Sequence, residues 1–281
     1  MIIVGYIIVI GSVLGGFLLS GGNLVVLIQP GEYITILGAA AGSFFASQTK
    51  YSFGLVLKSL KNAFGDPAMS KAHYLETLSL LYGLFVKMQR EGVISIEGDI
   101  ERPESSSIFG KYPNLAKNHL LVHFVADTLR VYLTTGSADD IDELMDEDLE
   151  AMHEEELLTA EAISHMAESM PGLGIVAAVL GVVLTMGQIN EPPEVLGHHI
   201  GAALIGTFIG ILFCYGFFGP MGAKLEVSAK ETHLYYNSVK EAVAAAIRGA
   251  TPIIAVEYGR RSIPHIFRPT FTEMEERLKN R

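Results

Sequence analysis

Apolar and polar residues are segregated into long blocks along this chain. Three windows contain no charged side chain: 2–20, 171–190 and 200–219. A fourth window, 33–49, is also uncharged but shorter and less apolar. Because a helix that crosses a membrane needs about 20 consecutive apolar residues, the pattern predicts four transmembrane helices.

The polar blocks have a different, helical pattern. In 70–91 the apolar residues recur every three or four positions, and Gly92 is placed to end the helix. Residues 113–134 repeat this spacing, whereas 102–113 is typical of a loop. From 221 to 248 the sequence is amphipathic and rich in alanine, which predicts that the fourth span continues as a long helix.

The predicted fold is therefore an all-α integral membrane protein. Four transmembrane helices carry a helical cytoplasmic domain inserted between the second and the third. We expect the divisions to be the first two spans, the cytoplasmic domain, the last two spans, and a cytoplasmic C-terminal helix and tail: 1–49, 50–170, 171–219 and 220–281.

Charge distribution predicts the orientation. The connections 21–32 and 191–199 contain no Lys or Arg, and all 20 basic residues lie in 50–170 or after 223. Since basic residues stay on the cytoplasmic side, we expect both polar segments and both termini to be cytoplasmic. The first window lacks a basic leader, which favours a membrane span over a signal peptide. The mean hydropathy of +0.35 agrees with a membrane protein.

One polar block is strongly acidic. Residues 139–156 hold eleven acids and no base, which argues against nucleic acid as a partner. The run is either a solvated helix face or a docking patch. The single cysteine, Cys214, lies inside a span and indicates no disulfide framework.

Two prolines lie where spans meet the cytoplasmic segments. Pro171 is at the start of the third span and Pro220 at the end of the fourth, each beside a glycine. Because proline removes a backbone donor and clashes with the preceding turn, these positions predict matched bends. The alternative is an ordinary helix start and stop.

The spans favour close packing but lack an ion carrier. Glycines four residues apart let helix backbones approach: 11/15, 38/42, 197/201 and 206/210. No ionisable residue lies well inside a window, and the only acid in the first fifty residues, Glu32, is at a membrane edge. The hydroxyls of Thr185 and Thr207 remain. An ion pathway would therefore need a carboxylate from a second protein.

Several blocks together resemble the MotA family of flagellar stator subunits. They are GYIIVIGSVLGGFLLSGG, QPGEYITILGAAAGSF, ISIEGDIERPESSSIF, MPGLGIVAAVLGVV and PIIAVEYGRR, in the family's order from residue 1 to about 275. The resemblance implies a non-enzymatic protein of the bacterial inner membrane, in contact with lipid and needing no cofactor or metal. It also implies a ring of five copies around two MotB subunits, whose aspartate carries the ion. Ion flow would turn this ring against the rotor protein FliG.

The resemblance also assigns roles to residues. Arg90 and Glu97, on either side of Gly92, correspond to the charges that contact the rotor, while Gln89 stands where the family often has a base. Pro171 and Pro220 correspond to the coupling prolines.

In the same way, Thr207 corresponds to the hydroxyl that faces the partner's aspartate. Thr185, the hydroxyl of the third span, is our second candidate for the pathway. Sodium-driven relatives carry threonines at the positions of Ala178 and Gly206. The absence of those hydroxyls favours protons as the transported ion.

Three other interpretations stay open. The related ExbB and TolQ proteins, which energise outer-membrane transport, usually have three spans. A membrane-anchored metalloenzyme is suggested by His119 and His123, four apart on a predicted helix, although no adjacent Glu completes a zinc motif. A passive membrane scaffold is the third.

Overall fold

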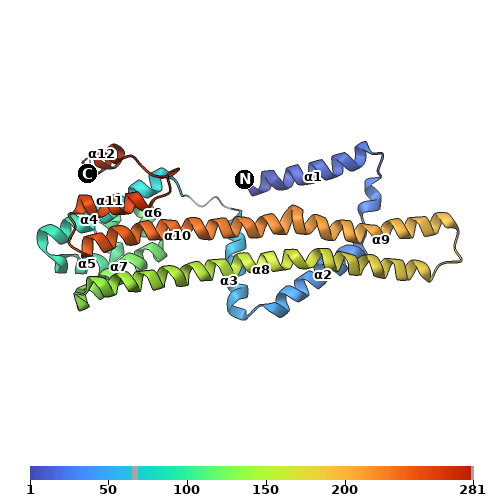
Figure 1. Cartoon of the computed structure of the whole chain (residues 1–281), viewed down its shortest axis with the longest axis horizontal. Coiled ribbons are helices and arrows are strands. Elements are labelled where there is room, and N and C mark those ends of the chain that lie inside the picture. Colours follow the sequence, from blue (N-terminus) through green and yellow to red (C-terminus); the bar gives the residue numbers. More distant parts are fainter. Residues whose placement is uncertain (65–68, 280–281) are drawn as a thin grey trace. The chain divides into compact units, whose positions relative to one another are not determined.

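The structure, a computed structural model, describes residues 1–64 and 69–279 (Figure 1). Residues 65–68 and 280–281, which belong to the predicted segments 50–170 and 220–281, lie outside the described part. Throughout that described part the regular structure is helical and contains no strand, as the sequence predicts. The chain divides into two compact units: Met1–Pro67 with Glu155–Ser228, and Ala68–Glu154 with Ala229–Arg281. We call them the membrane unit and the polar unit.

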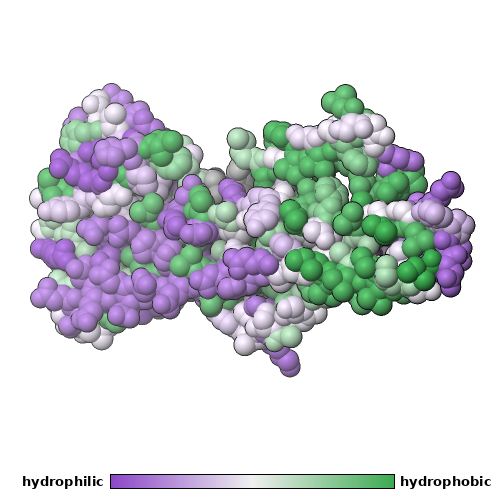
Figure 2. All heavy atoms as spheres, turned by 45° about the vertical axis from the view of Figure 1, so that its right-hand side comes forward, coloured by the Kyte–Doolittle hydropathy of each residue, from purple (hydrophilic) through white to green (hydrophobic). Residues whose placement is uncertain are grey.

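The membrane unit holds the apolar helices. Its elements are α1 (Ile2–Leu19), η1 (Leu24–Leu27), α2 (Pro30–Ser47), α3 (Lys50–Ala63), the second part of α8 (Ala138–Met186), α9 (Pro193–Phe213), the π-helical η5 (Cys214–Phe218) and the start of α10 (Gly219–Ile247). Four helices are long and apolar enough to cross a membrane, which confirms the four predicted spans. Figure 2 shows hydrophobic residues gathered over this unit.

The ends of these helices follow from local chemistry. Pro30 and Pro193 occupy the first turns of α2 and α9, where a missing backbone N–H costs no helical hydrogen bond. The Asn23 side chain accepts a hydrogen bond from Val25 N and begins η1. Helix α9, which carries the fourth apolar window, therefore begins at Pro193, several residues before that window.

The two prolines differ from the expected pair of breaks. Pro171 lies inside α8, which is one helix of 49 residues, so no helix begins there. Pro220 lies in the first turn of α10, directly after η5. A Cβ at Gly219 would lie 2.7 Å from the carbonyl oxygen of Cys214. A side chain at 219 would clash with this oxygen, so the π-helical turn before Pro220 requires glycine.

The polar unit contains the remaining elements. They are α4 (Lys71–Glu91), η2 (Val93–Ile96), α5 (Glu97–Glu101), η3 (Pro103–Ser105), η4 (Phe109–Lys111), α6 (Pro113–Ala116), α7 (His119–Thr135), the first part of α8, the last part of α10, α11 (Pro252–Ser262) and α12 (Phe271–Lys279). The predicted apolar face of 70–91 lies in its core, where Tyr74, Leu78, Leu81 and Phe85 are buried. Only short helical turns interrupt the predicted loop 102–113.

Helices α4, α10 and α11 form the centre of the polar unit. The hydroxyls of Thr77 on α4 and Tyr235 on α10 are hydrogen-bonded at 2.8 Å, and burial raises the pKa of Tyr235. A Cβ at Gly259 of α11 would lie 2.7 Å from the carbonyl oxygen of Ser238. Helix α11 therefore packs with its backbone against α10, and its opposite face stays exposed.

The acidic run on α8 is divided among several helix faces. Its apolar residues Ile141, Met145 and Leu149 enter the core. On another face, Lys240 Nζ of α10 lies 2.5 Å from Asp146 Oδ1, and Asp142 pairs with Arg248. Part of the run is thus used inside the unit to hold α10, beyond being a solvated face.

Candidate functional site

Glycines bring α8 and α9 into backbone contact within the membrane unit. A Cβ at Gly174 of α8 would lie 2.8 Å from the carbonyl oxygen of Gly206 on α9. A Cβ at Gly210 would lie 2.5 Å from the carbonyl oxygen of Met170. Neither helix has room for a larger side chain at these points. The glycine spacing 206/210 therefore marks a real contact, as the sequence indicates.

The carboxylate of Glu32 reaches this contact from α2. A Cβ at Gly206 would lie 2.5 Å from Glu32 Oε2, and one at Gly181 would lie 3.5 Å from Oε1. Glu32 Oε2 is buried and has no hydrogen-bond partner among the described residues. An unpartnered carboxylate at such a place costs free energy, and intramembrane acids that are kept despite this cost commonly serve ion pathways.

The two hydroxyls of the predicted pathway have different surroundings. Thr185 is buried, and its Oγ1 donates to the carbonyl oxygen of Gly181 one turn earlier at 2.9 Å. Thr207 is half-buried and follows Gly206 directly. Within residues 1–64 and 69–279 its hydroxyl makes no hydrogen bond. Thr207 is therefore the hydroxyl available to a further group.

Space is restricted at Gly206, one of the two positions at which a threonine is expected in sodium-driven relatives. A Cβ at Gly206 would lie 3.1 Å from Ala177 Cβ and 3.2 Å from Ala178 N, in addition to the close Glu32 oxygen. A threonine at 206 would therefore displace Glu32 or separate α8 from α9. Ala178 is half-buried on the α8 side of the same contact. The structure thus brings Ala178, Gly206 and Glu32 together.

The predicted rotor residues lie at a sharp corner of the polar unit. Helix α4 ends at Glu91, and Gly92 has φ +89°, a conformation that glycine adopts without strain. Arg90 is in the last turn of α4 and Glu97 in the first turn of α5, so each charge opposes the local helix dipole. Both side chains are exposed, and neither forms an ion pair within the described residues.

A buried ion pair fixes this corner from below. Lys87 Nζ lies 2.7 Å from Asp99 Oδ2, and Asp99 is buried. Ser106 Oγ donates to Asp99 Oδ1 at 2.5 Å, while Ser95 Oγ donates to the carbonyl oxygen of Gly92 at 2.6 Å. Asp99 thereby connects α4, α5 and the segment at Ser106, and positions the exposed charges above it.

Sequence reasoning missed Glu32, Lys87 and Asp99 as site residues. The only signal for Glu32 is that it is the lone acid of the first fifty residues. His119 and His123, considered as metal ligands, lie on α7, where His123 Nδ1 is 3.6 Å from Asp127 Oδ2. Among the described residues no group of three or more His, Cys, Asp or Glu side chains is placed to hold a metal ion.

Fold and site together define a helical membrane protein with a tightly packed helix pair and a polar unit that presents exposed charges. The family model described as "Motility protein A N-terminal" matches residues 3–92. The model described as "MotA/TolQ/ExbB proton channel family" matches residues 116–238. The chain is 38% identical over 280 residues to Motility protein A of Escherichia coli (strain K12), which covers 99% of this chain and 95% of the relative. The chain belongs to the Motility protein A family.

A second relative supports the same family, and two solved structures support the fold. Chemotaxis protein LafT of Vibrio parahaemolyticus is 32% identical, covering 98% of this chain and 96% of LafT. The C. jejuni MotAB structure superimposes with a TM-score of 0.78 at 22% identity, covering 94% and 95% of the two chains. The flagellar MotAB stator complex from Bacillus subtilis gives a TM-score of 0.75 at 20% identity, covering 99% and 98%. These two structures support the fold.

Replacing Lys87 by Met tests the corner. The substitution leaves the buried Asp99 carboxylate without its cation. We expect this to destabilise the corner by about 2 kcal/mol, which is less than for a fully buried pair because Lys87 is partly exposed. Amide exchange of residues 93–101 in the purified full-length chain should then accelerate roughly 30-fold. Glu97→Gln is the control, since it removes an exposed charge without an ion pair. Equal exchange in both variants would contradict the assigned role of Asp99.

Proposed function

We propose that this chain is the stator subunit of a bacterial flagellar motor, which conducts ions together with a MotB-type partner and drives rotation. The observation that carries the proposal is 38% identity to a Motility protein A along 99% of the chain. The Bacillus subtilis structure that shares this fold is a flagellar MotAB stator complex, which supports the kind of partner. The proposed activity is mechanical work from ion flow, with no enzymatic step and no cofactor.

The proposed ion pathway runs beside the α8–α9 contact. The partner supplies an aspartate, and the free hydroxyl of Thr207 faces it, with Thr185 as the second hydroxyl proposed for the pathway. Glu32 adds a second carboxylate whose Oε2 lacks a hydrogen-bond partner among the described residues. We assign to Glu32 the role of a relay or counter-charge for the ion.

Protons are the proposed ion. A site for sodium must replace the hydration shell with several oxygens, and Ala178 and Gly206 carry no side-chain oxygen. The closeness of a Cβ at Gly206 to Glu32 Oε2, 2.5 Å, supports the same choice, because a hydroxyl side chain does not fit there beside Glu32.

The proposed rotor contact is the corner at Gly92. Arg90 and Glu97 are exposed charges on a rigid support, which suits a contact with complementary charges on the rotor protein FliG. Exposed ion pairs contribute only about 0–1 kcal/mol each. Such contacts form and release easily, as a stepping motor requires.

The proposed coupling elements are Pro171 and Pro220. The π-helical turn Cys214–Phe218 before Pro220 supports a point of bending there. Pro171, inside α8, lacks the N–H that would bond one turn earlier, which weakens the helix locally. Amide exchange at 214–218, compared with and without ion flow, tests this role.

The proposed assembly is a ring of five copies around the partner in the bacterial inner membrane, with both termini cytoplasmic. Large apolar side chains on α1 and α8 are exposed in the single chain, among them Ile7, Ile8 and Leu184. Lipid and neighbouring copies are the natural cover for such surfaces.

Swimming of a strain that lacks its own stator tests the function. Supplied with this chain and its MotB-type partner, the strain should swim at a speed that is independent of sodium and is lost with a proton uncoupler. A speed that rises with sodium would support the motor function and refute protons as the transported ion. A stable complex without swimming would favour the transport-energising class of the same family.

Charge reversal at the corner separates a motor from a passive scaffold. Glu97→Lys should abolish swimming while the complex still assembles and conducts. The reason is that the Glu97 charge is proposed to face the rotor and forms no ion pair within the described parts of the chain. Glu104→Lys, a reversal at another acid of the same region, is the control. Normal swimming of the Glu97 variant would remove this residue from the rotor contact.

Neutralising Glu32 tests the relay. Glu32→Gln preserves size, so the α8–α9 contact and assembly should persist, whereas proton conductance and swimming should fall strongly. Glu32→Asp should restore part of the activity. Glu194→Gln, in the first turn of α9 and exposed, is the matched control. Unchanged conductance in Glu32→Gln would reduce Glu32 to a packing residue.

A further inference from the structure

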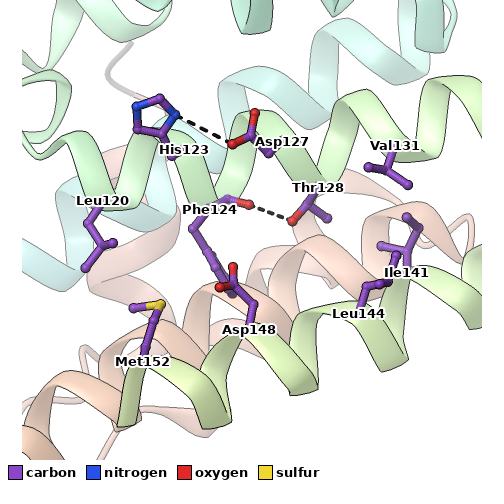
Figure 3. A pocket seen from close by; sticks show the side chains of 10 residues that line it. All are labelled: Leu120, His123, Phe124, Asp127, Thr128, Val131, Ile141, Leu144, Asp148 and Met152. Atoms are coloured by element: carbon purple, nitrogen blue, oxygen red, sulfur yellow. Dashed lines mark hydrogen bonds and ion pairs between the residues drawn. The ribbon is translucent and has the colours of Figure 1, made fainter. Parts of the chain in front are cut away.

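A groove opens between α7 and α8 in the polar unit and has no role in the function proposed above. It encloses about 320 Å³ and lies over the buried Phe124 (Figure 3). Leu120 on α7 and Leu144 on α8 stand on its two walls and are 49% and 52% exposed. Exposed leucines on both walls of one groove are typical of an interaction surface.

The rim of this groove is negative. Asp148 on α8 has no ion pair among the described residues, and partial desolvation followed by the charge of Asp127 raises the pKa of Asp148. Arg130 is shared between Asp127 and Glu101, so that trio keeps one excess negative charge when His123 is neutral. The groove therefore favours an apolar occupant that carries a cation.

Helix α11 of the same chain presents such a surface. Ile254, Tyr258 and Arg261 are spaced four and three residues apart, so they lie on one face of α11. They are 48%, 55% and 75% exposed. This face is opposite to Gly259, which packs against α10. We call these three residues the α11 stripe.

The stripe also has the complementary charge. Glu257 Oε1 accepts from Arg261 Nε at 2.8 Å, while both Glu257 oxygens accept from Arg260. Two guanidinium groups on one carboxylate leave one excess positive charge. Tyr258 and Arg261, one turn apart on α11, thus match Leu144 and the unpaired carboxylate of Asp148, which are one turn apart on α8.

We propose that the groove between α7 and α8 binds the α11 stripe of the neighbouring copy of this chain, with Arg261 placed against Asp148. The contact joins two different surfaces, so it is head-to-tail. A head-to-tail contact repeated around an axis closes a ring. The inference rests on the ring in the proposed function and adds the surfaces by which adjacent polar units are joined.

The stripe cannot fill the groove of its own chain in this fold. Within the polar unit α11 packs on α4 and α10. The groove is lined instead by residues of α7 and of the start of α8 (Figure 3). Both surfaces are thus free in a single chain, and each neighbour in a ring supplies the occupant that the other lacks.

Disulfide trapping tests the contact in the full-length complex with the MotB-type partner. The sole cysteine is first replaced, Cys214→Ala, and Leu144→Cys is combined with Tyr258→Cys. Mild oxidation in membranes should give a ladder of cross-linked species up to the closed ring, because the two sulfurs join only when the Cβ atoms approach to about 4 Å. Co-expressed single variants should stop at dimers.

The matched control pairs Leu144→Cys with Ile266→Cys, an 82% exposed position after α11 and outside the stripe. No ladder with the stripe pair, or an equal ladder with the control pair, overturns the proposal. Swimming of the Cys214→Ala parent reports separately on the stator function, so the failure of one is distinguished from the failure of the other.

A charge swap gives a second readout. Asp148→Arg should weaken ring assembly of the purified complex roughly tenfold, and adding Arg261→Asp should restore it, because the pair is re-formed with reversed signs. An intact ring in Asp148→Arg with impaired swimming would overturn the proposal and assign the groove to a basic partner protein instead.

Discussion

The close contact between α8 and α9 is the constraint on which the membrane unit depends. Lipid tails are as apolar as leucine side chains, so helices in a membrane associate through close packing and polar contacts. Gly174 and Gly210 supply the packing by removing every side-chain atom between the backbones. Gly206 supplies the polar contact, because the space that it leaves is taken by the Glu32 carboxylate. Packing and candidate ion chemistry therefore meet at a single glycine.

The polar unit holds exposed charges on a firmly packed support. Arg90 and Glu97 make no ion pair among the described residues, and their positions follow from Gly92 and from the Lys87–Asp99 pair beneath them. A buried ion pair contributes little net stability but strongly penalises any arrangement that separates its members. It therefore specifies the shape of the corner, and the surface charges stay free for a partner.

The sequence predicts what depends on periodicity and fails where distant segments meet. The four spans and the buried face of α4 follow from local patterns of apolar residues, since lipid and core select for them directly. Glu32 was assigned to a membrane edge because nothing local shows that its side chain reaches α8 and α9. Pro171 was expected at the start of a span, and the structure adds that the helix containing it, α8, begins earlier, at Ala138. The acidic run could not be divided into its faces before α7 and α10 were in place.

The energies involved limit what an ion-driven stator built this way can move. One elementary charge crossing 100 mV releases about 2.3 kcal/mol. The glycine contacts between α8 and α9 leave no room for further side-chain atoms, and overpacking such a contact costs about 1–3 kcal/mol per site. Exposed charge contacts of about 0–1 kcal/mol each are well within the energy released by one charge. The ion's energy is therefore comparable with the cost of rearranging the proposed surface contacts, at the Gly92 corner and between copies, which act together with the proposed bends at Pro171 and Pro220.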